Sequence, residues 1–320
     1  MHIARGLANL PPLPRGSVVT IGTFDGVHLG HHHLIRRLAA KGQELDAPVV
    51  VALFEPQPRE YFQPGQAPAR LFRLREKMVQ LRELPVDVVL LLRFDRAFAE
   101  QPAAEFIRRV LIEGLRARYL VVGDDFRFGK GREGDFALLR KTGVLAGFEV
   151  SDTPTLTLHG RRISSTWVRE LLEAGDCAGA RQLLGRPYAV CGRVVHGDKK
   201  GRRLGFPTAN IDLKRRNVPL SGVFAVTMRQ ADRWQRAGVA NVGVRPTVDG
   251  RGQVWLEVHL FDFDGDLYQQ TVEVQFHAKL RDERRFASLE ALQTQIVKDA
   301  AAARSVLERM GFFSNNAFHP

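Results

Sequence analysis

The sequence is poor in cysteine, with only Cys177 and Cys191 among its 320 residues. Two cysteines without a C-x-x-C pair exclude a disulfide framework and a cysteine-based metal cluster. Long apolar runs are also missing, because stretches such as Pro48–Phe54 stop well short of the ~18 residues that a membrane helix needs. Prolines interrupt the segment Met1–Gly16 before a signal-like apolar stretch develops. We therefore expect a soluble, cytoplasmic protein with no membrane partner.

The charge is strongly positive, with 47 Lys and Arg against 35 Asp and Glu and a net charge of +12. Such an excess suits nucleic acid, an anionic membrane surface or polyphosphate substrates. The basic residues are spread along the chain, without a continuous basic tail or an aromatic–basic RNA-binding pattern. We therefore predict small-molecule substrates and no nucleic-acid partner.

The first half of the chain alternates apolar runs with helical patterns. Runs of Val, Ile and Leu without strict alternation are typical of parallel strands buried on both faces. The predicted strands are Ser17–Gly22, Pro48–Phe54, Val86–Leu92 and Tyr119–Gly123, and the predicted helices are His32–Leu45, Leu71–Leu84 and Ala103–Leu115. This pattern predicts an open parallel α/β sheet, which binds ligands beyond the carboxyl ends of its strands.

The pattern changes after Leu184. Short strand patterns broken by glycine, proline and asparagine predict an antiparallel barrel or sandwich, and an amphipathic helix over Ser288–Arg309 follows. The strand patterns are Ala189–Val195, Gly222–Met228, Ala237–Gly243, Val254–Phe261 and Thr271–Phe276. The sequence therefore predicts two domains of different class, residues 1–184 and 185–320.

The strongest local motif is GTFDGVHLGHHHL, Gly22–Leu34, between the first predicted strand and the first predicted helix. Its glycines allow tight turns, and a helix N-terminus offers free N–H groups to phosphate. His28 and His31 are three residues apart at that point, so both imidazoles can face one phosphate. An H-x-G-H at a strand-to-helix turn suits nucleotidyl transfer, in which the enzyme positions phosphates and stabilises charge.

Other interpretations of this loop stay open. The three successive histidines, His31–His33, could bind a metal, although neighbouring imidazoles on a helix point in different directions. The loop could also be a structural glycine turn. His32 and His33 fit solvated helix positions.

Two further segments support a nucleotide site. Val121–Asp135 follows a predicted strand and carries glycines together with Arg127, Lys130 and Arg132. Arg161–Leu172 contains consecutive hydroxyl side chains where they would cap a helix, with an arginine one turn later; the alternative for it is an ordinary N-cap.

The second half has a basic, glycine-punctuated loop within Gly192–Ile211. The loop is no Walker A motif, but it offers N–H groups and cations to a polyphosphate. Thr208 and Asn210, two residues apart on an extended segment, supply neutral oxygen ligands on one side, which suits a Mg²⁺ that bridges phosphates. A basic surface hairpin is the alternative.

A strand-period segment follows at Val254–Phe263. Glu257 shares one face with aromatic and imidazole side chains, those of Trp255, His259 and Phe261, while Leu256, Val258 and Leu260 share the other. A carboxylate placed in this way can accept a proton from an alcohol. The alternative is a solvent-facing strand residue.

The segments Gly22–His31, Phe54–Pro58, Val121–Gly134 and Ile163–Arg169 resemble the FAD synthetase module of bacterial bifunctional riboflavin kinase/FAD synthetases. The resemblance implies a Rossmann-like nucleotidyltransferase that joins AMP to FMN, with His28 and His31 holding the ATP phosphates. It further implies ATP contacts at Gly22, Phe24, Asp25, Gly30, Asp125, Arg162, Ser165, Thr166 and Arg169, and flavin contacts at Pro56, Pro58 and Phe62. Gln57 departs from the histidine of many members.

The second half resembles the riboflavin kinase module of the same family, a small antiparallel β-barrel with a C-terminal helix. The matching segments are GRRLGFPTAN, GVFAV, GVANVGVRPTV, LEVHLFDF and Leu280–Ile296. The resemblance implies that Glu257 activates the 5′-hydroxyl of riboflavin and that Thr208 and Asn210 bind Mg²⁺. It also implies ATP contacts at Gly197, Lys199, Gly201, Arg203, Thr208 and Asn210, and flavin contacts at Arg281 and Glu283. Gln269 departs from the usual glycine, which we interpret as a turn adjustment.

By this resemblance the chain uses ATP to phosphorylate riboflavin to FMN, then adenylylates FMN to FAD with release of pyrophosphate, as a monomer or weak homo-oligomer. Two rivals stay open. The first half could adenylylate another phosphorylated substrate, or the chain could be a basic nucleic-acid-binding protein, whose binding would weaken steeply with salt.

Overall fold

The computed structural model describes residues 1–153, 155–197, 205–215, 217–230, 234–245 and 253–313. The chain divides into two compact units. The first contains Met1–Pro68 and Lys77–Ile163, and the second contains Ala69–Glu76 and Ser164–Pro320. Helices α7 (Ser165–Glu173) and α8 (Cys177–Leu184) are counted with the second unit, because they pack on each other and α8 packs on strands of that unit. The domain boundary at 184/185 stays a prediction.

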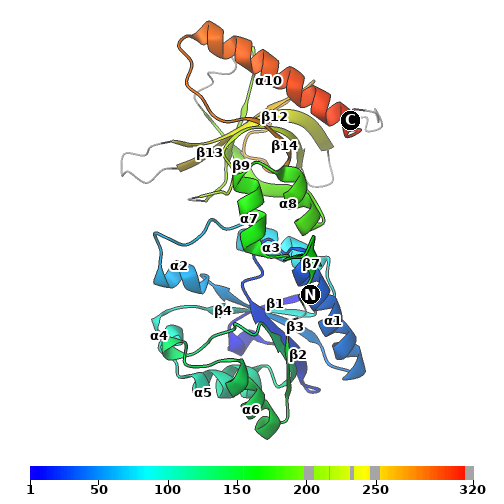
Figure 1. Cartoon of the computed structure of the whole chain (residues 1–320), viewed down its shortest axis with the longest axis vertical. Helices are drawn as coiled ribbons and strands as arrows, with labels where there is room; N and C mark the ends of the chain where they lie inside the picture. Colours follow the sequence, from blue (N-terminus) through cyan, green and yellow to red (C-terminus); the bar gives the residue numbers. More distant parts are fainter. Residues whose placement is uncertain (154, 198–204, 216, 231–233, 246–252, 314–320) are drawn as a thin grey trace. The chain divides into compact units, whose positions relative to one another are not determined.

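Among the described residues of the first unit, a parallel sheet has the strand order β1-β4-β3-β2-β5-β6 (Figure 1). This confirms the predicted open α/β sheet. The two edge strands, β1 and β6, were not predicted, because each has four residues and few apolar side chains. The strands are β1 (His2–Arg5), β2 (Ser17–Gly22), β3 (Val49–Glu55), β4 (Val88–Arg93), β5 (Ala117–Val122) and β6 (Glu149–Asp152).

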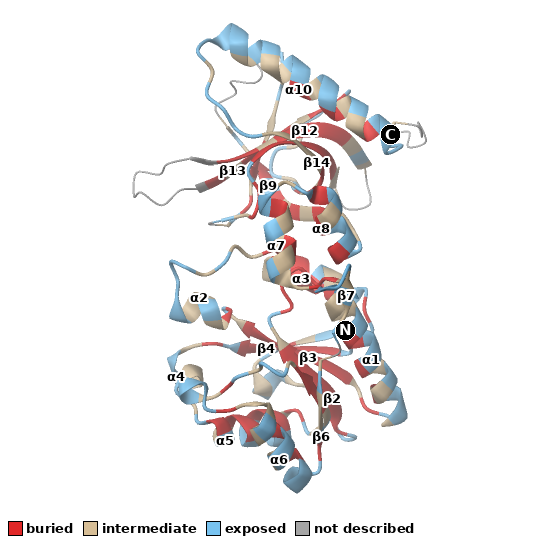
Figure 2. Cartoon of the chain, in the orientation of Figure 1, coloured by how far each residue is buried: buried red, intermediate tan, exposed pale blue. Residues whose placement is uncertain are grey.

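Helices cover both faces of this sheet, and its central strands are buried (Figure 2). Gly42 of α1 (Leu29–Glu44) lies against Val18 and Val49 on one face. On the other face, α5 (Ala103–Phe106) and the π-helical η2 (Ile107–Gly114), which together form the predicted helix Ala103–Leu115, pack on alternate strand residues. The remaining elements are η1 (Leu7–Asn9), α2 (Pro58–Phe62), α3 (Leu74–Arg82), α4 (Arg96–Ala99), η3 (Lys130–Arg132), α6 (Phe136–Ala146) and the hairpin β7 (Thr157–Leu158) with β8 (Arg161–Arg162).

The strand order reverses direction next to β2. From β2 the chain proceeds through β3 to β4 on one side, and β5 and β6 are then added on the other side of β2. In parallel α/β sheets, ligands bind beyond the carboxyl ends of the strands at such a switch point. The segments that follow β2 and β5 therefore flank the expected ligand site.

The second unit contains a closed antiparallel barrel with the strand order β10-β13-β12-β11-β14-β9. Its closure decides between the barrel and the sandwich that the strand pattern left open. Leu256, Val258 and Leu260 of β13 are buried, whereas Trp255 and Glu257 are partly exposed, so the predicted alternation is confirmed. The strands are β9 (Tyr188–Val195), β10 (Ala209–Asp212), β11 (Gly222–Gln230), β12 (Trp234–Arg245), β13 (Gln253–Leu260) and β14 (Thr271–Arg281).

The long C-terminal helix α10 (Leu289–Arg309) packs on the outer face of β11, β12 and β14 (Figure 1). Ala303 and Leu307 of the helix pack with Val223 and Val239 of the barrel. Phe261 joins this cluster, so it is buried although it lies on the same face as Glu257. Helix α10 thus covers the outer surface around Val223 and Val239. Glu257 is not part of the cluster that packs against the helix.

Both cysteines lie in the second unit as free thiols, with Cys177 buried and Cys191 partly buried. Burial raises the pKa of Cys177 and of Cys191 to about 12. Both thiols are therefore protonated at neutral pH, and thiolate chemistry is not available to them.

A buried ion pair anchors the segment Ala69–Glu76 within the second unit. Arg215 Nη2 donates to Glu76 Oε2, and the two side chains are only 3% and 6% exposed. Glu76 Oε1 also accepts from the backbone N–H of Cys191 at 2.8 Å. Arg215 Nη1 donates to the carbonyl of Leu71 at 3.1 Å. Arg215 and Glu76 therefore hold two segments of the second unit together, although in the sequence both look like ordinary surface charges.

We expect Arg215→Ala to destabilise the second unit by about 2–4 kcal/mol, because the buried Glu76 carboxylate loses its nearest cation and keeps only the more distant Arg73, whose Nε lies 3.9 Å away. The three tryptophans, Trp167, Trp234 and Trp255, all belong to the second unit, so tryptophan fluorescence during urea unfolding reports on that unit. The exposed Lys298→Ala is the matched control and should change stability by less than about 0.5 kcal/mol. A loss below about 1 kcal/mol in Arg215→Ala would contradict the anchoring role.

Candidate functional site

The histidine loop connects β2 to α1 at the switch point of the sheet. His28 is the N-cap of α1, and its ring stacks on that of His31, with centroids 3.7 Å apart and 16° between planes. His31 Nδ1 accepts a hydrogen bond from the backbone N–H of His28 at 3.3 Å. This bond places the proton of a neutral His31 on Nε2, where it can be donated. The structure therefore brings together the two imidazoles that the sequence selected.

Glycine at position 30 leaves room for the His28 ring, because a Cβ there would lie 3.1 Å from it and would press on the ring. Gly26 has φ 80°, and two side-chain-bearing neighbours, Phe24 and Val27, also have positive φ values of 47° and 40°. Such values are unusual for bulky and β-branched residues and persist where packing imposes them. Phe24, Val27 and the predicted ATP contact Asp25 are all buried. The loop is thus held in one uncommon shape by its own core contacts.

A residue that sequence reasoning missed also holds this loop. Lys77 of α3 is 1% exposed, and its Nζ donates to the carbonyl of Thr23 at 2.5 Å. In the sequence, Lys77 belongs to a basic helix and has the appearance of a surface charge. The sequence contains one weak indication of this burial: Lys77 lies on the same helical face as the apolar residues Met78 and Leu81.

The predicted flavin contacts follow β3, the neighbour of β2. Pro58 begins α2, Pro56 is exposed, and Phe62 at the end of α2 is 62% exposed, which leaves an aromatic ring open to a planar ligand. Gln57 is the N-cap of α2, and its backbone N–H donates to Glu60 Oε2 at 3.0 Å. Its Nε2 is buried without a hydrogen-bond partner in the described part of the chain.

The other predicted ATP contacts lie in different elements. Asp125 follows β5, and its Oδ1 lies 2.6 Å from where a Cβ of Gly123 would be, so the carboxylate lies over that glycine. Arg162 ends the exposed hairpin strand β8. Ser165, Thr166 and Arg169 lie in α7, whose N-cap is Ser164, and Arg169 Nε donates to the carbonyl of Ala69 at 2.7 Å. These three belong to the second unit.

A polar row crosses three adjacent strands on the outer face of the barrel. Glu257 of β13 is paired in register with Asn210 of β10 on one side and with Asn241 of β12 on the other. Residues that are directly opposite in an antiparallel pair point to the same face, with Cβ atoms about 4.5–5.5 Å apart. The carboxylate therefore has an amide neighbour on either side. Asn241 was not selected from the sequence.

Hydrogen bonds orient the side chains of this row. Trp255 Nε1 donates to Glu257 Oε1 at 2.6 Å. His259 Nδ1 lies 2.8 Å from the carbonyl of Pro207, which fixes the segment that carries Thr208. Asn210 is 6% exposed, and its Oδ1 is buried without a hydrogen-bond partner among the residues that the structure describes. An oxygen in that condition is suited to a ligand such as a cation.

Gly197 makes room for Asn210, because a Cβ at residue 197 would lie 2.3–2.5 Å from the amide atoms of Asn210. Three other predicted ATP contacts, Lys199, Gly201 and Arg203, lie outside the described residues. Gln269 has φ 65°, a left-handed conformation that glycine adopts freely, which supports the interpretation of that departure as a turn adjustment.

The two predicted flavin contacts of the barrel differ in their partners. Arg281, at the end of β14, donates from Nε and Nη2 to the buried carboxylate of Asp299 in α10, at 3.0 and 2.7 Å. Its guanidinium therefore ties the helix to the barrel. Glu283 is exposed and accepts from Asn241 Nδ2 at 3.1 Å.

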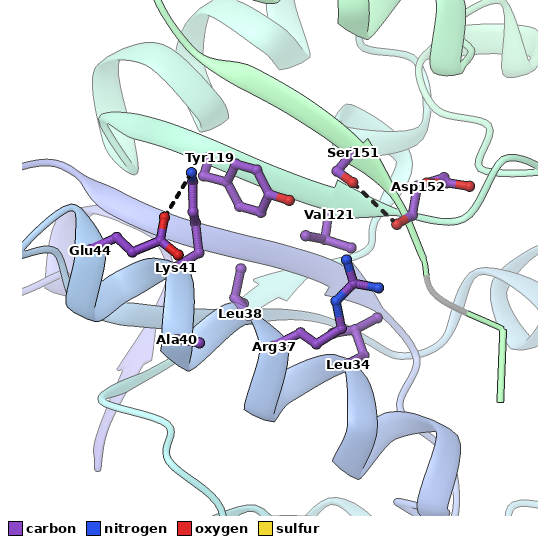
Figure 3. Close-up of a pocket in the computed structure, with 10 residues that line it drawn as sticks. All are labelled: Leu34, Arg37, Leu38, Ala40, Lys41, Glu44, Tyr119, Val121, Ser151 and Asp152. Atoms are coloured by element: carbon purple, nitrogen blue, oxygen red, sulfur yellow. Dashed lines mark hydrogen bonds and ion pairs between the residues drawn. The ribbon is translucent and has the colours of Figure 1, made fainter.

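A separate pocket of about 250 Å³ lies between α1 and strands β5 and β6 (Figure 3). Two cationic side chains line it, Arg37 and Lys41, and Lys41 is paired with Glu44 at 3.0 Å and lies over the Tyr119 ring. The residues that line it include none of the predicted site residues. Within the described part of the chain, no group of three or more His, Cys, Asp or Glu side chains could hold a metal ion.

Comparison with known proteins assigns a family to each half of the chain. Residues 10–167 match the family model for FAD synthetase, and residues 184–307 match that for riboflavin kinase. The chain is 53% identical over 306 residues to a bifunctional riboflavin kinase/FMN adenylyltransferase of Pseudomonas fluorescens, covering 96% of this chain and 98% of the relative. The chain belongs to the bifunctional riboflavin kinase/FMN adenylyltransferase family. The relative in Escherichia coli K12 is 51% identical, with 95% of this chain and 97% of the relative covered.

This chain is also similar in fold to a solved structure described as a macrolide-efflux protein of Streptococcus pneumoniae, with a TM-score of 0.81 and 30% identity. The match covers 95% of this chain and 99% of that one. Among the described residues, no helix has the length and apolar character to span a membrane.

Proposed function

We propose that the two activities this chain has as a family member, riboflavin kinase and FMN adenylyltransferase, are carried out by two separate sets of residues. The observation that carries the proposal is the placement of Glu257 between two amide side chains on the barrel, apart in sequence from the stacked histidines at the switch point. Each set has the groups that its reaction requires.

In the kinase reaction, Glu257 accepts the proton of the riboflavin 5′-hydroxyl as that oxygen attacks the γ-phosphorus of ATP and ADP leaves. The Trp255 hydrogen bond holds one carboxylate oxygen and so orients the other. Thr208 and Asn210 would hold Mg²⁺, since the buried Asn210 Oδ1 fits a cation ligand, and a bound Mg²⁺ neutralises phosphate charge.

In the adenylyltransferase reaction, a phosphate oxygen of FMN attacks the α-phosphorus of ATP and pyrophosphate leaves. His28 and His31 stand at the N-terminus of α1, where imidazole N–H groups and the helix dipole stabilise phosphate charge. The exposed Phe62 ring offers a surface for the flavin. The substrates other than riboflavin are polyanions, which suits the net charge of +12. We place both reactions in the cytoplasm.

The test is chromatography of flavins after incubation of the pure protein with riboflavin, ATP and Mg²⁺. We expect FMN to appear first and FAD to follow. FMN that accumulates without FAD would support the barrel assignment and refute the assignment of the histidine loop. Unchanged riboflavin, together with unchanged FMN when FMN is supplied instead, would refute both.

Substitution of Gly197 tests the Asn210 side of the kinase site. We expect Gly197→Ala to displace the Asn210 amide and raise the KM for Mg²⁺–ATP in FMN formation by about 10–100-fold. FAD formation from FMN should not change. Gly65→Ala is the matched control, because a Cβ there would contact nothing within 4 Å. An unaltered KM in Gly197→Ala would remove Asn210 from the ATP site.

A further inference from the structure

The carboxylate of Glu283 rests on strand β12 of the barrel. Asn241 Nδ2 donates to Glu283 Oε1 at 3.1 Å. Two residues along the same face, a Cβ at Gly243 would come within 2.3 Å of the same oxygen. The absence of a side chain at Gly243 therefore makes the space that the carboxylate occupies. Asn241 and Gly243 together form what we call the Glu283 seat.

The seat adjoins the proposed base. Asn241 is directly opposite Glu257 in the β12–β13 register, so both side chains point to the outer face. With its Nδ2 donating to Glu283, the amide is held in one orientation. Its Oδ1 is buried and has no hydrogen-bond partner within the described ranges. The Asn241 amide thus lies between two carboxylate residues: it is hydrogen-bonded to Glu283, and it is the register neighbour of Glu257 on β13.

The segment after β14 is anchored at two points. Arg281 is bound to the buried Asp299 carboxylate of α10, and Glu283 is bound to the seat. Because Glu283 is solvent-exposed, the second contact contributes little to stability. Its evident consequence is positional: it fixes the segment beside Glu257.

We propose that the Glu283 seat is a positioning device for riboflavin in the kinase reaction, with Asn241 as its positioning residue. The proposal rests on the proposed function, since it assumes that riboflavin is bound beside Glu257 and against the segment that carries Glu283. Loss of the seat lets that segment move, so riboflavin binds less well while the ATP side of the site is unaffected.

The test exchanges donor and acceptor across the seat. In Asn241→Asp two carboxylates face each other, and we expect the KM for riboflavin to rise by about 10–100-fold. Glu283→Gln keeps an oxygen opposite Asn241 Nδ2 and should have a smaller effect. In the double variant, the introduced glutamine amide can donate to the introduced aspartate carboxylate, so the KM should return to within about threefold of that of Glu283→Gln alone. Gly243→Ala, which fills the seat, should raise the same KM.

The KM for ATP, FAD formation from FMN and the unfolding midpoint by tryptophan fluorescence should stay as in the unsubstituted protein. Double-variant effects that equal the product of the single effects would overturn the proposal, as would an unchanged riboflavin KM in Asn241→Asp. A parallel change in the KM for ATP or in unfolding would show a merely structural contact and also overturn it. Failure of the proposed function is distinguishable, because the unsubstituted protein would then form no FMN.

Discussion

Glu257→Gln is expected to lower the rate of FMN formation by about 10²–10⁴-fold, the usual contribution of a positioned general base. Glutamine has nearly the same shape and keeps an oxygen that can accept from Trp255 Nε1, so the barrel and the polar row should be retained. What is lost is the carboxylate that takes the proton of the riboflavin hydroxyl. The effect should therefore fall on kcat and leave the KM for ATP nearly unchanged.

The chain supplies its own internal control for this variant. FAD formation from added FMN uses the histidine loop and should proceed at the unsubstituted rate. Glu308→Gln, an exposed carboxylate on α10, is the matched control for loss of a negative charge and should leave both reactions intact. Full kinase activity in Glu257→Gln would exclude Glu257 from the proton transfer.

The sequence predicted which face of a strand Glu257 occupies but not what lies opposite it. A period of two residues, with Leu256, Val258 and Leu260 on one side, is enough to assign the faces. The register that places Asn241 beside Glu257 depends on pairing between two strands that are not continuous in sequence, and that pairing is part of the closed barrel. The sequence shows Asn241 as a polar residue in an otherwise apolar strand, but it does not show that Glu257 is its register partner.

A similar limit applies to the first unit. The glycines and histidines of the loop after β2 are close in sequence, so their meeting at a helix N-terminus could be predicted from local rules. Lys77 lies more than fifty residues away, and only tertiary packing brings its ammonium group to the carbonyl of Thr23. Buried charges such as Lys77 and Glu76 look like surface residues in the sequence, because burial of a charge depends on partners supplied from elsewhere in the chain.

His28→Ala is expected to produce the opposite pattern, with FAD formation lowered by about 10²–10³-fold, the range for loss of one donor to developing phosphate charge. The variant also removes the ring that stacks on His31, so the remaining imidazole loses its orientation. FMN formation on the barrel should be unaffected, and riboflavin supplied with ATP should then accumulate as FMN.

His33→Ala is the matched control, because His33 lies in the same run of histidines but is exposed on α1. We expect its FAD formation to equal that of the unsubstituted protein, which would separate the contribution of a positioned imidazole from that of local positive charge. Equal losses in the two variants would point to charge alone and contradict a positioning role for His28. Undiminished FAD formation in His28→Ala would refute the assignment of the ATP phosphate site to the stacked imidazoles of His28 and His31.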